Sequence, residues 1–213
     1  MKRLFLVVIA CMAMSPALMA QKIELTPMYG YQLGAKLDYG PGYLKITDGS
    51  QYGVTLNANI RDGIAAELSW WRQDAELRLK DKFDLPLETR LSDVAVDYFL
   101  LGAVKYAELN QFRPFAGFSG GLVIFTPNNE NQDVLNRSLS SSTKFAFTFT
   151  GGIKYMISEK VGIRIQGQLL FPVEWGGIYV GIGTGGPSTG ASLGSTIIQG
   201  AFSGGLIIGL GGE

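Results

Sequence analysis

Two short motifs near the C-terminal end of the chain match sequences that bind nucleotides or carry a catalytic serine. Gly181, Gly183 and Gly186 have the spacing of a dinucleotide-binding loop, which presents a pyrophosphate to the N-terminus of the helix that follows. The segment 190 to 194 matches a nucleophile elbow, whose serine must be activated by a base. Pro187 and further small residues follow the glycines, so no helix is predicted there, and the sequence has no histidine. We interpret both motifs as parts of an outer loop.

The composition excludes most catalytic and metal-binding chemistry. The absence of histidine removes the commonest metal ligand and the usual general base. Cys11 is the single cysteine and lies in the first twenty residues, so thiolate chemistry is not expected in the remaining chain. Lys and Arg number 18 against 18 Asp and Glu, which does not predict the basic surface that nucleic-acid phosphates require. We therefore predict no enzyme, no cofactor, no metal and no nucleic-acid partner.

The first twenty residues have the pattern of an export signal. A positively charged start precedes an apolar run from residue 4 to 14, and small residues end the segment. The run is too short to cross a bilayer as a helix. We predict a signal peptide at 1–20 and one outer-membrane domain at 21–213. In a second interpretation, residues 8 to 11 resemble a lipobox and the cysteine carries a lipid.

Apolar and polar residues alternate with a period of two along the rest of the chain, as in half-buried β-strands. The segment 144 to 155 is the clearest case, and 161 to 171 and 198 to 210 show the same split. The apolar face of the segment 144 to 155 holds Phe145, Phe147, Phe149, Gly151, Ile153 and Tyr155. In 93 to 106 we assign the apolar face to Val94, Val96, Tyr98, Leu100, Gly102, Val104 and Tyr106. The opposite face of that segment then holds Asp93, Ala95, Asp97, Phe99, Leu101, Ala103 and Lys105.

Eight such segments are expected, and the connections between them alternate in length. The segments cover 22–33, 51–60, 64–77, 92–107, 112–125, 143–157, 161–173 and 196–210. Three connections are short turns, whereas the four at 34–50, 78–91, 126–142 and 174–195 are longer. An outer-membrane barrel with both termini in the periplasm has short periplasmic turns and longer outer loops. The sequence therefore predicts an all-β fold, an eight-stranded antiparallel up-and-down transmembrane β-barrel.

A soluble barrel or β-sandwich would show the same alternation with its apolar faces turned inward. Three features favour the transmembrane orientation. The apolar faces run for six or seven positions, which approaches a band of about 25 Å. The opposite faces hold many small residues and few charges, as suits a narrow interior. Aromatic residues near the strand ends suggest two interfacial girdles: Tyr106 and Tyr155 beside short turns, and Tyr52, Trp70 and Phe171 towards the longer loops.

Two segments resemble a known family. The segment 23 to 34, IELTPMYGYQLG, resembles the opening strand of the small bacterial outer-membrane barrels of the OmpW/OmpX-like group. The segment 112 to 121, FRPFAGFSGG, resembles their central strand. The resemblance implies a location in the cell outer membrane of Gram-negative type, contact with outer-membrane lipid, and help from the barrel-assembly machinery during biogenesis.

Charged residues on the predicted inward faces form the one group of side chains for which the sequence predicts specific interactions. They are the acids Glu24, Glu67, Asp93 and Asp97 and the bases Lys105, Lys144, Lys154 and Arg164. Charges in a confined interior must be paired to offset their desolvation. Because eight strands leave room for little more than side chains, we predict a salt-bridged plug, with an ion path as the alternative. Of the two neighbouring tryptophans, Trp70 is expected at the membrane interface and Trp71 inside.

Two functions are compatible with this architecture. The first is a monomeric barrel with a structural or surface-interaction role, which meets an extracellular partner through loops 34–50 and 126–142. The second is a small porin-like or OmpW-like barrel that passes or binds small or apolar molecules. Conductance across a planar bilayer would separate them.

Overall fold

Strands make up the regular secondary structure that the computed structural model describes. It describes residues 22–39, 42–81, 85–131, 140–173, 178–183, 186–191 and 198–210, so the predicted signal peptide and its cleavage site lie outside the described residues. Eight strands are long: β1 (Ile23–Gln32), β4 (Gly49–Arg61), β5 (Ile64–Asp81), β6 (Leu85–Tyr106), β7 (Phe112–Asn128), β8 (Ser142–Met156), β9 (Val161–Val173) and β12 (Gln199–Leu210). Within these ranges, no helix has the length and apolar character needed to cross a membrane.

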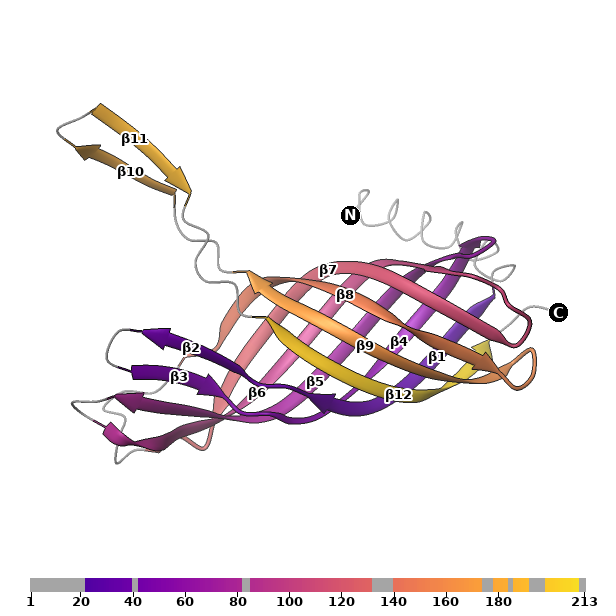
Figure 1. Cartoon of the computed structure of the whole chain (residues 1–213), viewed down its shortest axis with the longest axis horizontal. Coiled ribbons are helices and arrows are strands. Elements are labelled where there is room, and N and C mark those ends of the chain that lie inside the picture. Colours follow the sequence, from indigo (N-terminus) through magenta and orange to yellow (C-terminus); the bar gives the residue numbers. More distant parts are fainter. Residues whose placement is uncertain are drawn as a thin grey trace, which may run out of the picture.

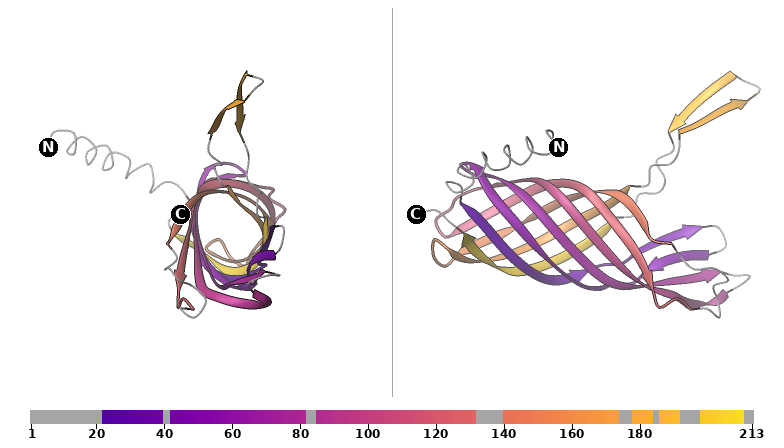
Figure 2. Two further views of the ribbon diagram at one scale, coloured as in Figure 1. Left: turned by 90° about the vertical axis from the view of Figure 1, so that its left-hand side faces the viewer. Right: turned by 180° about the vertical axis from the view of Figure 1, so that it is seen from behind.

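The eight long strands close into a ring. Their order is β5-β4-β1-β12-β9-β8-β7-β6, and a further pairing of β6 with β5 completes the circle. The pairings are antiparallel, including the one between the first and last strands, in which Ile23 lies opposite Leu210. Figure 1 shows the ring from the side, and the left view of Figure 2 looks into it. The predicted eight-stranded up-and-down barrel is confirmed.

The longer connections contain more strand than expected. The segment 34–50 includes β2 (Ala35–Tyr39) and β3 (Gly42–Ile46), and β3 pairs with the end of β5. The expected loop at 78–91 is largely a continuation of β5 and β6, which stay paired as far as Asp81 and Leu85. These strands extend beyond the ring at the end opposite to the short turns (Figures 1 and 2). We call β2, β3, residues 77–81 of β5 and residues 85–90 of β6 the outer extension.

The dinucleotide-like glycines lie in a hairpin. The strands β10 (Ile178–Gly183) and β11 (Gly186–Ala191) pair with each other in a separate two-stranded sheet, with Gly183 opposite Gly186. Because a dinucleotide-binding loop must lead into a helix, this backbone cannot form that site.

The apolar faces of most strands point away from the ring. On β8, Phe147 is 42% exposed whereas Thr148 is fully buried, and on β9 Ile165 is 65% exposed beside the fully buried Arg164. The same alternation holds on β12, where Phe202 is exposed and Ser203 is buried. This is the pattern of a barrel that presents an apolar wall to lipid and a polar face to its lumen.

The prediction from the sequence of which face of β6 points towards lipid is wrong. Tyr98 and Leu100 are buried inside the ring, whereas Phe99 and Leu101 are 49% and 65% exposed on its outer wall. Tyr106 is also buried inside, so it is not part of an outer girdle, although Tyr155 does face outward. Both faces of β6 are rich in apolar residues, so alternation alone does not reveal which one faces lipid.

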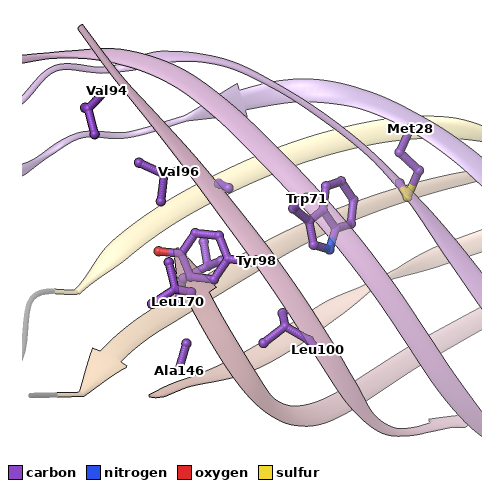
Figure 3. Close-up of a cluster of buried hydrophobic side chains, with 10 residues drawn as sticks. Met28, Trp71, Val94, Val96, Tyr98, Leu100, Ala146 and Leu170 are labelled. Atoms are coloured by element: carbon purple, nitrogen blue, oxygen red, sulfur yellow. The ribbon is translucent and has the colours of Figure 1, made fainter. Parts of the chain in front are cut away.

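The inward face of β6 builds an apolar cluster within the lumen (Figure 3). Tyr98, Val96 and Leu100 pack there with Trp71 of β5 and Leu170 of β9. The predicted inward position of Trp71 agrees with this packing, and Trp70 lies on the outer wall against Tyr52, with ring centroids 6.0 Å apart. The lumen is therefore apolar in part and not purely polar.

Replacing an inward glycine is expected to be costly. A Cβ at Gly121 on β7 would overlap the backbone carbonyl oxygen of Phe99 and lie 2.9 Å from the Cα of Leu100. At the outward Gly151 on β8, the nearest atom would be 3.9 Å away. We expect Gly121→Ala to lower the free energy of unfolding by about 1–3 kcal/mol and Gly151→Ala to change it by less than about 0.5 kcal/mol. Urea unfolding in lipid vesicles measures both, and equal losses would contradict the close approach of β7 to β6.

Candidate functional site

A buried arginine organises the lumen near the short turns. The Arg164 side chain on β9 is fully buried, and its Nη1 donates to Glu67 Oε2 at 2.7 Å and to Asn57 Oδ1 at 3.0 Å. Its Nε donates to Gln166 Oε1 at 2.6 Å, and its guanidinium carbon lies 4.5 Å from the centre of the Phe115 ring. Hydrogen bonds from Nη1 and Nε and a cation–π contact thus replace part of the water that a buried guanidinium loses, while Nη2 has no hydrogen-bond partner among the described residues.

A second ion pair lies beside the first. Lys154 Nζ on β8 donates to Glu24 Oε2 on β1 at 2.5 Å, and both side chains are buried. The ammonium also lies 5.6 Å from the centre of the Tyr106 ring. Two acids and two bases are therefore paired at this end of the lumen.

The Arg164–Glu67 bond crosses the bore. β5 and β9 are four positions apart in the ring of eight strands, so they form opposite walls. The bond between Arg164 and Glu67 therefore spans the full width of the lumen. An interior of eight strands is about wide enough for side chains to fill, so this bridge and its neighbours occupy the bore at this level.

A second crossing lies further from the short turns. Tyr98 donates from its hydroxyl to Gln199 Oε1 at 2.8 Å, and β6 and β12 are again opposite walls. Gln51 Nε2 on β4 donates to Gln168 Oε1 at 3.2 Å, and Gln168 lies four residues beyond Arg164 along β9. Side chains thus bridge the lumen at two heights.

The fold has known counterparts. No protein-family model and no curated protein sequence matches the chain. Among solved structures, the outer membrane protein OprG from Pseudomonas aeruginosa gives a TM-score of 0.63 at 13% identity, covering 91% of this chain and 97% of OprG. Neisserial surface protein A gives 0.58 at 11% identity, covering 88% of this chain and 97% of that protein. The chain has the fold of a small outer-membrane β-barrel. Its apolar wall agrees with a location in the outer membrane, where the short-turn end is periplasmic and the outer extension is extracellular.

The barrel brings together four of the eight charges expected in its lumen. Glu24, Glu67, Lys154 and Arg164 form the two periplasmic pairs. Lys144 shares the inward face of β8 but lies further towards the extracellular end, with its Nζ 5.9 Å from the centre of the Phe125 ring.

The structure corrects the positions of Asp93, Asp97 and Lys105. All three share the outward face of β6, because Tyr98 and its even-numbered neighbours point inward. Asp97 accepts hydrogen bonds from Trp70 Nε1 at 3.1 Å and Arg72 Nη1 at 3.5 Å on the outer wall. Asp93 accepts a bond from Asn129 Nδ2 at 2.8 Å near the extracellular end, and Lys105 is exposed at the periplasmic end. These residues therefore contribute nothing to a lumenal plug.

Buried glutamines in the extracellular half of the lumen were not among the predicted site residues, although two of them, Gln168 and Gln199, lie on faces that the alternation assigns to the lumen. Five are buried: Gln32, Gln51, Gln73, Gln168 and Gln199. Gln73 Nε2 donates to the backbone oxygens of Gln32 and Thr47, each at 3.3 Å. Gln73 Oε1 and Gln199 Nε2 lack a hydrogen-bond partner among the described residues. The signal in the sequence is the position of each glutamine on the face opposite to an apolar stripe, but an uncharged amide gave no reason to select it.

A network of charged and polar side chains holds the outer extension. Arg78 on β5 donates to Glu76 Oε2 at 2.7 Å and to Glu88 Oε1 at 3.2 Å, and the Tyr43 hydroxyl on β3 donates to Glu88 Oε2 at 2.7 Å. These bonds link β3, β5 and β6 beyond the ring. The Tyr43 hydroxyl and, to a smaller extent, Arg78 lower the pKa of the Glu88 carboxyl from its usual value.

Acid is expected to loosen the outer extension. Because the pKa of Glu88 is lower in the folded protein than in the unfolded chain, its contribution is present above the unfolded value of about 4. That contribution is lost as the pH falls through the folded pKa. Amide exchange in β3, corrected for the intrinsic rate, should rise between pH 6 and pH 3 relative to exchange in β9. Glu88→Gln should already exchange faster at pH 6, and an unchanged rate in this variant would contradict the role of the carboxylate.

No recognisable metal site is formed by the residues that the structure describes. Among the described ranges, no group of three or more His, Cys, Asp or Glu residues is placed to hold a metal ion. The described side chains form ion pairs and hydrogen bonds within the lumen and at the extracellular rim.

Proposed function

We propose that the protein is an integral outer-membrane barrel with a structural or surface-interaction role and no catalytic activity. The observation that carries this proposal is the bridging of the lumen at two heights by Arg164–Glu67 and Tyr98–Gln199. Bridges between opposite walls leave little space for a solute in an interior of eight strands. The surface offered to partners is then the outer extension.

The outer extension has a feature that suits contact with other molecules. β2 stands at the end of the sheet order and, among the described strands, pairs only with β3. A free strand edge can accept an extended peptide through backbone hydrogen bonds. The β2–β3 hairpin lies within the segment 34–50 and supports its assignment as a partner-binding loop, whereas much of 126–142 lies outside the described residues.

Two measurements test this function. Wild-type protein in planar bilayers should give no steady single-channel conductance, because the lumen is bridged. Cells that display a variant with residues 35–46 replaced by a short Gly-Ser turn should keep a folded barrel but lose adhesion to immobilised matrix proteins and glycans. Steady conductance, or adhesion that is unchanged by the replacement, would count against the proposal.

Passage of small molecules is the second candidate. Gln73 Oε1 and Gln199 Nε2 favour it, because neither has a hydrogen-bond partner among the described residues and a buried amide group without a protein partner requires water or a solute. Steady single-channel openings from the wild-type protein would move the assignment to this function.

A further inference from the structure

A furrow runs along the outer wall of the barrel. It consists of two adjoining hollows of about 890 Å³ and 560 Å³, which share Gly151, Gly167 and Phe202. The larger hollow begins beside Phe112 at the periplasmic end, and the smaller one reaches Leu33 towards the extracellular end. The furrow lies mainly over β12, β9 and β8, within the wall that faces lipid.

The furrow exists because two neighbouring strands lack side chains at the same height. Gly167 of β9 lies directly opposite Gly151 of β8, and Ala116 of β7 continues the row. A Cβ would meet no atom nearer than 3.6 Å at Gly167 or 3.9 Å at Gly151, so the floor is open. Ile165, which is 65% exposed, and Phe202, which is 67% exposed, rise beside this floor.

The position of the furrow restricts what can occupy it. It is continuous with the lipid-facing wall, so water would be placed in an apolar environment without hydrogen-bond partners. A second barrel is convex and would touch the rims of the furrow without reaching its floor, which would leave the floor without dispersion contacts. A thin, flexible hydrocarbon chain can follow the furrow and fill it.

We propose that the furrow binds one acyl chain of a phospholipid from the periplasmic leaflet. Its periplasmic end carries Phe112 and Tyr155, whose ring centroids are 5.0 Å apart. The Tyr155 hydroxyl donates to Gln111 Oε1 at 3.1 Å, so this end combines apolar rings with polar groups, as interfacial aromatics do. The head group lies at this end, and the chain extends from there over Gly151 and Gly167.

Filling the floor of the furrow tests the proposal. Gly151→Leu and Gly167→Leu place side chains in the furrow, and Ala103→Leu on the outward face of β6 is the matched control on a different part of the wall. Each full-length protein is extracted from membranes in mild detergent, its fold is checked by far-UV circular dichroism, and bound phospholipid is counted by native mass spectrometry. Spin-labelled phosphatidylglycerol in reconstituted vesicles reports the chain that is immobilised on the wall.

The wild-type protein and Ala103→Leu should retain one phospholipid per barrel and an immobilised component in the spectrum. Both glycine variants should lose the bound phospholipid and reduce that component. If a leucine variant fails to fold, Phe202→Ala, which removes a rim without adding volume, should also weaken retention.

Two results would overturn the proposal. The first is equal phospholipid retention by the wild-type protein and by the folded furrow variants. The second is a wild-type dimer in lipid that the glycine variants dissociate, which would make a second copy of the chain the occupant.

Discussion

Glu67→Ala is expected to lower the free energy of unfolding by about 3–5 kcal/mol. The substitution leaves the Arg164 guanidinium buried without its acid, because Glu67 accepts the 2.7 Å bond from Nη1. It also removes the acceptor for Asn57 Nδ2, which donates to Glu67 at 2.9 Å. Equilibrium unfolding in urea, with the protein folded in lipid vesicles, measures the loss.

A double variant separates the stranded charge from the loss of packing. Glu67→Met together with Arg164→Met replaces both charges with apolar side chains, and it should cost less than Glu67→Ala alone. A double variant as unstable as the sum of the two single methionine variants would show that the two residues do not act as a pair. Conductance that appears in Glu67→Ala while the barrel remains folded would further indicate that the bridge closes the bore.

Leu101→Arg is expected to lower the free energy of unfolding by about 2–4 kcal/mol, the cost of a cationic side chain near the middle of the apolar wall. Leu101 is 65% exposed on the outward face of β6, and its cross-strand partner Leu68 is 53% exposed. The same unfolding assay in lipid vesicles reports the difference.

Two phenylalanine variants verify which face of β6 meets lipid. Leu101→Phe should be tolerated, since lipid accommodates the larger ring. Leu100→Phe should cost about 1–3 kcal/mol, because Leu100 is buried in the lumenal cluster with Tyr98 and Trp71. If Leu100→Phe is the tolerated variant, the face of β6 has been assigned the wrong way round.

The fold class follows from patterns that lie within single strands. On β8 the residues Phe145, Phe147 and Phe149 alternate with Ala146 and Thr148, and the structure places the aromatic set outside and the small set inside. Turn lengths then specify eight antiparallel neighbours. Both properties are local, because a strand places successive side chains on opposite faces and a short turn joins adjacent strands.

The partners across the lumen could not be read from the same patterns. Sequence reasoning selected Glu67 and Arg164 as inward charges, but their pairing depends on β5 and β9 being opposite walls of the closed ring. The prediction that Asp97 lies in the lumen was wrong. Because both faces of β6 are rich in apolar residues, its pairing with β5 and β7 determines which face points inward.

The sequence by itself therefore determined the number of strands in the ring, the orientation of strands with one apolar face, and the types of charge available to the lumen. Only the tertiary structure decided which face of β6 points inward, the bonds Arg164–Glu67 and Tyr98–Gln199 across the bore, and the strands beyond the ring. The physical reason is the separation along the sequence of the residues that interact. Alternation records contacts between a strand and its immediate surroundings, whereas closure of the barrel brings together side chains about 100 positions apart, and the alternation within a strand does not specify which of them meet.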